Sequence, residues 1–261
     1  MTYCVGMMVD DGLAMIADTR TNAGVDNISS YKKLHIVDHP GDRVLAIATA
    51  GNLSLTQTAL AMVKEGVQLP NSDHPETLET APNLFRCAQL LGHALRDVRR
   101  EIAPSLEADS LKASASMLLG GQVRGGEMGL YLIYSQGNFI ECGPDTPFLQ
   151  IGELKYGKPI LDRALKARST LAEAVKIGLI SFDSTIRSNI AVGGPFDLAI
   201  MRRGALDMET RRIDADDPYF RGIAMDWSEA LNRAIGALPS PPWLRDSRIV
   251  PGPGAVRQEA G

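Results

Sequence analysis

The order of strand and helix signals constrains this chain more than any other feature of its sequence. Apolar runs typical of strands are followed by two helical patterns, a second strand block, two more helical patterns and a last strand pair. Strands are predicted at residues 3–9, 13–17, 33–37, 43–50, 114–120, 128–134, 139–141, 196–202 and 205–213, and helices at 53–67, 82–102, 159–166, 171–183 and 228–238. Segregated blocks of this kind are typical of antiparallel sheets faced with helices. We therefore predict an α+β fold with two sheets packed face to face between outer helices.

A tight turn at Asp10-Asp11-Gly12 joins the first two strands. Asp-Gly fits the positive φ angles of a hairpin turn, so these strands should run antiparallel. The end of the second strand then lies beside the start of the first, and Asp18 is expected next to Thr2. The polar residues 19–31 are expected to form a loop, and so are residues 71–81.

The helical patterns have recognisable ends. Asn52 or Ser54 can cap the first helix, and Pro104 is expected to stop the second. Residues 239–261 contain five prolines and few core residues, which favours a flexible tail or a docking arm. We predict one domain over residues 1–238 and a tail over residues 239–261.

Composition excludes several classes of function. The net charge of −4, from 27 basic and 31 acidic residues, argues against a nucleic-acid-binding protein. The chain has three cysteines without CxxC spacing, which is typical of reduced thiols in a cytoplasmic protein. No apolar run approaches the ~18 residues of a membrane span. A cytoplasmic protein without nucleic-acid or membrane partners is therefore expected.

Thr2 becomes a candidate nucleophile if Met1 is removed. A terminal threonine carries a hydroxyl and a free α-amine on one residue. That amine has a reference pKa of about 7.7–8.0, so it can act as a base near neutral pH. This pairing is one known way to activate a weak nucleophile.

Several short blocks of the chain resemble proteasome β-subunits. Those subunits begin with Thr, carry Asp and, two residues later, Arg at the end of the second strand, then show Lys-Lys and Ala-Gly. The matching residues are Thr2, Asp18 with Arg20, Lys32-Lys33-Leu34 and Ala50-Gly51. Within that superfamily the chain is most similar to the Anbu family of bacterial ancestral β-subunits. The basis is its Met-Thr-Tyr-Cys-Val-Gly start, the block from Phe182 to Asn189 and a C-terminal extension.

The resemblance covers most of residues 2–213 and implies a four-layer α/β/β/α sandwich of the N-terminal nucleophile hydrolase type. It implies that Thr2 Oγ attacks an amide carbonyl and that the Thr2 amine accepts the proton. Lys33 would favour the neutral amine and stabilise negative charge, and Asp18 would orient Lys33. The backbone N–H of Gly51 would stabilise the oxyanion.

A second group of residues is implied to support the amine. Asp183 matches an aspartate of the β-subunits, and Ser188 and Ser184 compete for the serine that follows it. The Gly-Gly pair expected soon afterwards comes later, at Gly193-Gly194. In the turn expected at Ile151-Gly152-Glu153, Glu153 replaces a serine.

The resemblance further implies a threonine peptidase that acts on peptides or unfolded proteins and needs no metal or organic cofactor. It implies self-association into a ring or an open helical ring; whether an ATPase partner exists stays open. The alternatives are an N-terminal nucleophile amidase on a small-molecule amide and a non-catalytic ring subunit. Cys4 is a rival nucleophile, although its place inside a strand favours packing.

Overall fold

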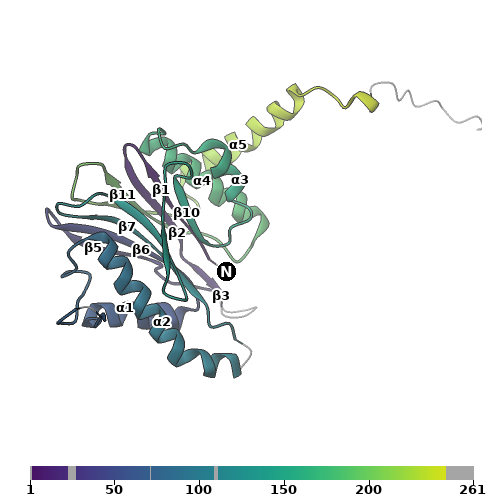
Figure 1. The fold of residues 1–261 in the computed structure, drawn as a ribbon. Coiled ribbons are helices and arrows are strands. Elements are labelled where there is room, and N and C mark those ends of the chain that lie inside the picture. The colour runs from purple at the N-terminus through teal and green to yellow at the C-terminus, as the bar shows by residue number, and fades with distance from the viewer. Residues whose placement is uncertain (1, 23–27, 71, 109–110, 245–261) are drawn as a thin grey trace, which may run out of the picture. The chain divides into compact units, whose positions relative to one another are not determined.

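The computed structural model describes residues 2–22, 28–70, 72–108 and 111–244. In the unit Met1–Ala224, two five-stranded sheets lie face to face with helices on both outer faces (Figure 1). This arrangement confirms the predicted α/β/β/α sandwich. A second unit, Met225–Gly261, holds the later part of α5 (Pro218–Ala237) and the 3-10 helix η1 (Pro242–Leu244). Most of the predicted tail lies outside the described residues and stays a prediction.

The first sheet contains the start of the chain and has the order β10-β1-β2-β11-β12. Its strands are β1 (Tyr3–Val9), β2 (Gly12–Asp18), β10 (Phe148–Gly152), β11 (Phe196–Arg202) and β12 (Glu209–Ile213). Every neighbouring pair is antiparallel. The predicted hairpin is confirmed, because Cys4 lies opposite Ala17 and Asp18 therefore ends beside the first residues of β1.

The second sheet has the order β5-β6-β7-β8-β9 and is also antiparallel. Its strands are β5 (Leu34–His39), β6 (Arg43–Gly51), β7 (Ala115–Val123), β8 (Gly129–Tyr134) and β9 (Phe139–Glu141). Each was predicted from its apolar run. The ends of β5 and β6 that lie near Lys33 and Gly51 supply candidate site residues.

Four helices form the outer layers of the sandwich. α1 (Leu53–Glu65) and α2 (Leu84–Ala108) pack on the second sheet, and α3 (Lys158–Ala164) and α4 (Leu171–Ser188) pack on the first (Figure 1). Asn52 caps α1, since its Oδ1 accepts a hydrogen bond from Leu55 N at 3.3 Å. Thr170 and Glu173 form a capping box at the start of α4. No helix among the described residues is long and apolar enough to cross a membrane.

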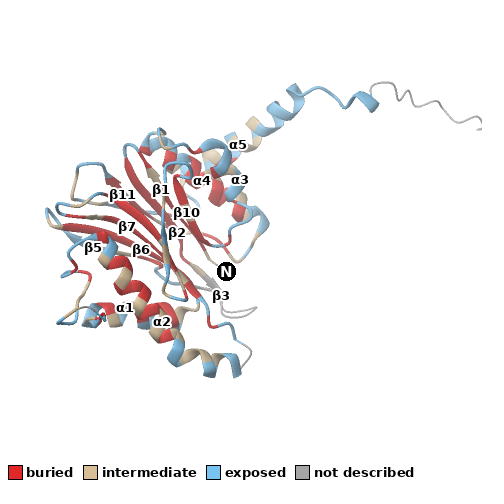
Figure 2. Ribbon diagram, viewed as in Figure 1, coloured by how far each residue is buried: buried red, intermediate tan, exposed pale blue. Residues whose placement is uncertain are grey.

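Three buried apolar layers hold the sandwich together, and Figure 2 shows them along the strands and the inner helix faces. One lies between α1, α2 and the second sheet, and one between α3, α4 and the first sheet. The third lies between the two sheets and includes Cys4, Leu13, Leu34, Ala48 and Leu118. Burial of these side chains is the main stabilising term of the fold.

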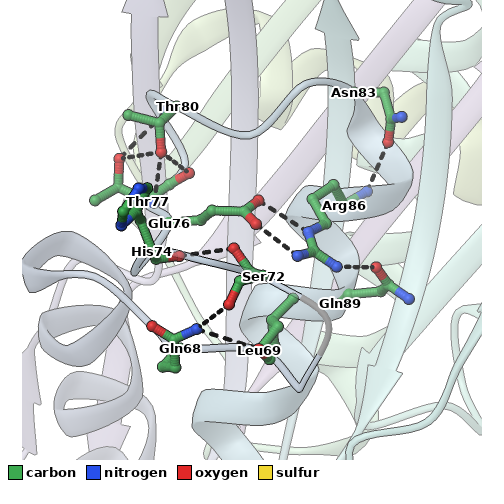
Figure 3. Close-up of polar contacts among 10 residues, drawn as sticks. All are labelled: Gln68, Leu69, Ser72, His74, Glu76, Thr77, Thr80, Asn83, Arg86 and Gln89. Atoms are coloured by element: carbon green, nitrogen blue, oxygen red, sulfur yellow. Dashed lines mark hydrogen bonds and ion pairs between the residues drawn. The ribbon is translucent and has the colours of Figure 1, made fainter.

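The connection from α1 to α2 is held by polar contacts (Figure 3). Arg86 donates to both carboxylate oxygens of Glu76, at 2.8 and 2.5 Å, and this pairing lowers the pKa of Glu76 to about 2. Gln68 Nε2 donates to Ser72 O. The loop predicted at residues 71–81 is confirmed where it is described, and side-chain hydrogen bonds fix its course.

Two regions contain strands that were not predicted. Residues 19–31 contain a two-stranded ribbon of β3 (Arg20–Asn22) and β4 (Ile28–Ser30), closed by a hydrogen bond from Tyr31 N to Thr19 O at 2.9 Å. Such a ribbon needs no apolar face, so hydrophobic periodicity does not reveal it. β10 was not predicted: the turn expected at Ile151-Gly152-Glu153 overlaps its end, and the strand pairs with β1 along its whole length.

Three predicted helix ends were wrong. α4 continues past its predicted end at Asp183 to Ser188. α2 continues through Pro104 to Ala108, because Ile102, Ala103 and Leu106 pack against the core beneath it and compensate for the lost hydrogen bond. α5 begins at Pro218, ten residues before the predicted start at residue 228. Asp217 caps it by accepting from Tyr219 N and Phe220 N at 2.9 and 3.1 Å. Asp-Pro is a recognisable helix start that the apolar pattern alone does not show.

Candidate active site

Asp18 lies directly beside the start of the chain. Its Oδ1 accepts a hydrogen bond from Tyr3 N at 3.0 Å, and the side chain is fully buried. The β1–β2 hairpin produces this contact, because β2 ends opposite the first residues of β1. A carboxylate is thereby fixed one residue from Thr2.

Lys33 completes a buried ion pair with Asp18. Its Nζ donates to Asp18 Oδ1 at 2.8 Å and to Arg20 O at 2.6 Å, and only 5% of its side chain is exposed. Burial raises the pKa of Asp18, while the Lys33 ammonium and the backbone N–H groups of Tyr3 and Gly193 oppose that rise. A buried charge needs an opposite charge nearby. Here Lys33 and Asp18 supply this for each other.

The second sheet contributes the end of β6. Thr49 N donates to Lys33 O at 3.0 Å, and Cys4 Sγ lies 3.8 Å from Thr49 O across the gap between the sheets. Residues two apart on a strand share a face, so Thr2 belongs to the face of β1 that carries Cys4. Gly51 lies two residues beyond Thr49, at the same end of the sandwich.

Gly51 has a backbone conformation that favours glycine. Its φ is +102°, and a Cβ there would overlap Ser114 O, just before the neighbouring strand β7. Glycine is therefore required at this position for steric reasons. Gly51 is the last residue of β6, and it is exposed. Whether its N–H serves as an oxyanion donor stays a prediction.

Cys4 is unsuited to be the nucleophile. The thiol is fully buried between the two sheets, and burial raises its pKa far above the usual value. The thiolate is the reactive form of cysteine. The predicted packing role of Cys4 is therefore favoured over the alternative role as nucleophile.

The end of β10 encloses Thr2 on its other side. Glu153 N donates to Thr2 O at 2.7 Å, and a Cβ on Gly152 would overlap the same carbonyl. The Glu153 carboxylate is buried, and its Oε2 accepts from Asn189 Nδ2 at 2.9 Å. Sequence reasoning placed Glu153 here, but it missed Asn189.

The loop after α4 is anchored on the junction of β2 and β3. Arg20 donates to Ile190 O at 2.8 Å, and Thr19 Oγ1 donates to Pro195 O at 2.8 Å. These contacts carry residues 190–195 past Asp18 and hold Asn189 at the end of α4. The loop is thus part of the support of the site.

Asp183 and Ser188 lie on α4 with other surroundings. Asp183 Oδ2 accepts from Arg187 Nε at 2.9 Å, and Ser188 is an exposed residue at the helix end. Within the part of the chain that the structure describes, neither hydrogen-bonds to Thr2, Asp18 or Lys33. The residue of this region that does contact the surroundings of Thr2 is Asn189, through Glu153, and no signal in the sequence identifies it.

The fold and this site define a class of protein. Two antiparallel sheets between helix layers, with the start of β1 beside a buried Lys–Asp pair, form an N-terminal nucleophile hydrolase sandwich of the proteasome type. The described residues contain no group of three or more His, Cys, Asp or Glu side chains placed to hold a metal ion.

The comparisons with known proteins agree with that class. Residues 2–201 match the family described as "Proteasome subunit". Proteasome subunit beta 2 of Pyrobaculum aerophilum is 27% identical over 212 residues, which cover 79% of this chain and 92% of that protein.

Solved Anbu structures are more similar. The Anbu complex of Pseudomonas aeruginosa is 42% identical, with a TM-score of 0.83 over 94% of this chain and all of that one. Anbu from Yersinia bercovieri is 41% identical, with a TM-score of 0.81 over 92% of this chain and 99% of that one. The chain therefore belongs to the Anbu (ancestral beta-subunit) branch of the proteasome subunit family.

Proposed function

We propose that this protein is a threonine peptidase whose nucleophile is Thr2 after removal of Met1. The observation that carries the proposal is the buried Lys33–Asp18 pair, tied to the chain start through the hydrogen bond from Tyr3 N to Asp18. An ammonium held beside a terminal threonine favours the neutral form of its α-amine. The neutral amine is the form that can accept a proton.

The proposed reaction has two acyl transfers. Thr2 Oγ attacks the carbonyl carbon of a peptide bond, and its proton passes to the Thr2 α-amine directly or through a water. The tetrahedral intermediate collapses, the leaving amine takes that proton, and an ester to Thr2 remains. A water then attacks the ester, releases the carboxylic acid and restores the hydroxyl.

Negative charge develops on the substrate oxygen in both steps. The Gly51 N–H is the proposed donor to this oxygen, and one such donor contributes about 3–4 kcal/mol to transition-state stabilisation. Lys33 adds a positive charge nearby. The contacts of Glu153 and Asn189 favour these two residues, over Asp183 and Ser188, as the support of the amine.

Two measurements test the proposal. The intact mass of the natively expressed protein reports whether Met1 is removed. Labelling by a threonine-reactive covalent inhibitor should be lost in Thr2→Ala and kept in Thr210→Ala, an exposed threonine of β12. A fully retained Met1 contradicts the proposed threonine peptidase activity and favours the alternative of a non-catalytic subunit. Undiminished labelling of Thr2→Ala places the reactive group elsewhere.

We also propose that the chain self-associates into a ring or an open helical ring in the cytoplasm. The Pseudomonas aeruginosa relative is described as a helical assembly of the Anbu complex. All three cysteines are free, which fits a reducing compartment. Light scattering coupled to size-exclusion chromatography should give a mass of many protomers. A monomer or dimer that still reacts with the inhibitor favours the alternative amidase on a small-molecule amide.

A further inference from the structure

Glu153 is a buried carboxylate beside the start of the chain. Only 7% of the residue is exposed, and its backbone N–H donates to Thr2 O at 2.7 Å. Its Oε1 accepts from Lys155 N at 3.1 Å and its Oε2 from Asn189 Nδ2 at 2.9 Å, and both donors are uncharged. No Lys, Arg or His side chain of the described residues forms an ion pair with Glu153. A buried carboxylate without a cation is unfavourable.

The backbone of β1 directs the nitrogen of Thr2 to this carboxylate. In a strand, the N–H and C=O of one residue point to the same neighbouring strand, and the next residue points to the other side. Tyr3 N points to Asp18 on β2, and Thr2 O points to Glu153 at the end of β10. The Thr2 nitrogen therefore faces the Glu153 side.

Asn189 fixes the direction of the Glu153 side chain. Its Oδ1 accepts from Ala191 N at 3.1 Å, and its own N–H donates to Thr185 O at 2.8 Å at the end of α4. With Oδ1 occupied, the amide presents Nδ2 to Glu153. Each carboxylate oxygen keeps a free lone pair that can accept another hydrogen bond.

We propose that the Glu153 carboxylate, positioned by Asn189, binds the α-ammonium group that Thr2 carries once Met1 is removed. The inference rests on the Met1 removal in the proposed function, but it does not require peptidase activity. Glu153 is then a positioning residue that orients the terminal amine and favours its charged form. The amine becomes a base at a higher pH than Lys33 alone would allow.

Other charges act on the same amine. Lys33 disfavours the ammonium and Asp18 favours it, as a like and an opposite charge do. Other charged side chains towards this end of the neighbouring elements are Arg20 on β3, Lys155 after β10, and Asp183 and Arg187 in the last turns of α4, which pair with each other. The test must therefore separate Glu153 from this background.

The experiment measures the protonation of the amine directly. The chain is produced behind ubiquitin and released so that it begins at Thr2. Trace labelling with acetic anhydride across pH, read by mass spectrometry of the N-terminal peptide, gives the pKa of the Thr2 amine. Glu153→Gln should lower that pKa by about one unit, because an opposite charge within contact shifts a pKa by about 1–3 units. At acidic pH the labelling rate then rises about tenfold.

Asp162→Asn is the matched control, since it removes a half-exposed carboxylate from α3. It should leave the pKa of the amine unchanged. Asn189→Ala should lower the pKa of the amine less than Glu153→Gln does. This variant replaces Glu153→Gln in the test if Glu153→Gln does not fold. An unchanged pKa in either variant, or an equal shift in the control, overturns the proposal. If the pKa of the amine shifts as expected in a protein that cleaves no peptide, the peptidase proposal fails and the proposed ion pair stands.

Discussion

Lys33 Nζ and Asp18 Oδ1 lie 2.8 Å apart where both side chains are almost completely buried. Neither charge can be solvated, so each depends on the other. The pair also connects the two sheets, because Asp18 ends β2 and Lys33 precedes β5. Stability and reactivity should therefore both be lost when Lys33 is removed.

Lys33→Ala should destabilise the protein by about 3–5 kcal/mol, because it leaves the Asp18 carboxylate buried without a counter-charge. Urea unfolding followed by circular dichroism measures this loss. Lys33→Ala should abolish labelling by the threonine-reactive inhibitor. Asp162→Asn, in the exposed pair with Lys158, should change neither property. Equal stabilities of Lys33→Ala and Asp162→Asn would show that the buried pair is not coupled to folding.

Much of this arrangement follows from the sequence. The Asp10-Asp11-Gly12 turn fixes the register of β1 and β2, and this register alone brings Asp18 beside Thr2. The strand runs and helix periodicity give the sandwich, since each apolar face needs a partner. The roles of Thr2, Asp18, Lys33 and Gly51 stay predictions, although the structure brings Asp18 and Lys33 into contact.

The parts that sequence reasoning missed depend on contacts without an apolar signature. β10 has only five residues, and it joins β1 through backbone pairing and through the hydrogen bond from Gln150 Nε2 to Tyr3 Oη. Asn189 acts through one amide that reaches Glu153 from another element, so neither residue's neighbours in sequence reveal the pair. Asp183 was matched to an aspartate of the β-subunits, but in the fold its carboxylate pairs with Arg187, one turn further along α4.

The pH dependence of inhibitor labelling should reflect the protonation of Asp18. Burial raises the pKa of this carboxyl, so it takes up a proton at a higher pH than an exposed aspartate does. Labelling that needs the ionised pair should fall as the pH drops through that raised pKa, which lies above the ordinary value of about 3.9. The folded protein binds this proton more tightly than the unfolded chain, so protonation of Asp18 stabilises the fold in that window.

A pH series of inhibitor labelling rates, measured on the wild type and on Asp18→Asn, resolves this effect. The variant has no proton to gain at this position, so its acid limb should be displaced or absent. The wild type should show no acid unfolding over the same pH range by circular dichroism. An identical acid limb in both proteins would assign it to another group.

Cys4→Ala should keep inhibitor labelling, because the buried thiol is protonated at neutral pH and cannot compete with Thr2. Removal of Sγ leaves a small void between the sheets, and a modest loss of stability of about 1 kcal/mol is expected. Intact-mass analysis after treatment with the inhibitor gives the answer. Loss of the adduct in Cys4→Ala, with Thr2→Ala still labelled, would make Cys4 the nucleophile.

Gly51→Ala tests the end of β6. The residue has φ +102°, and an added Cβ would overlap Ser114 O, so β6 and β7 must move apart. Gly204→Ala is the matched control, because Gly204 also has positive φ, +82°, but faces open space. Positive φ alone costs about 1–3 kcal/mol in either variant, so a larger loss of stability in Gly51→Ala measures the overlap.

Because that overlap displaces the proposed oxyanion donor, inhibitor labelling should fall at least tenfold in Gly51→Ala and stay unchanged in Gly204→Ala. Normal labelling in a destabilised Gly51→Ala protein would separate the fold of β6 from the reaction and remove the Gly51 N–H from the proposed mechanism.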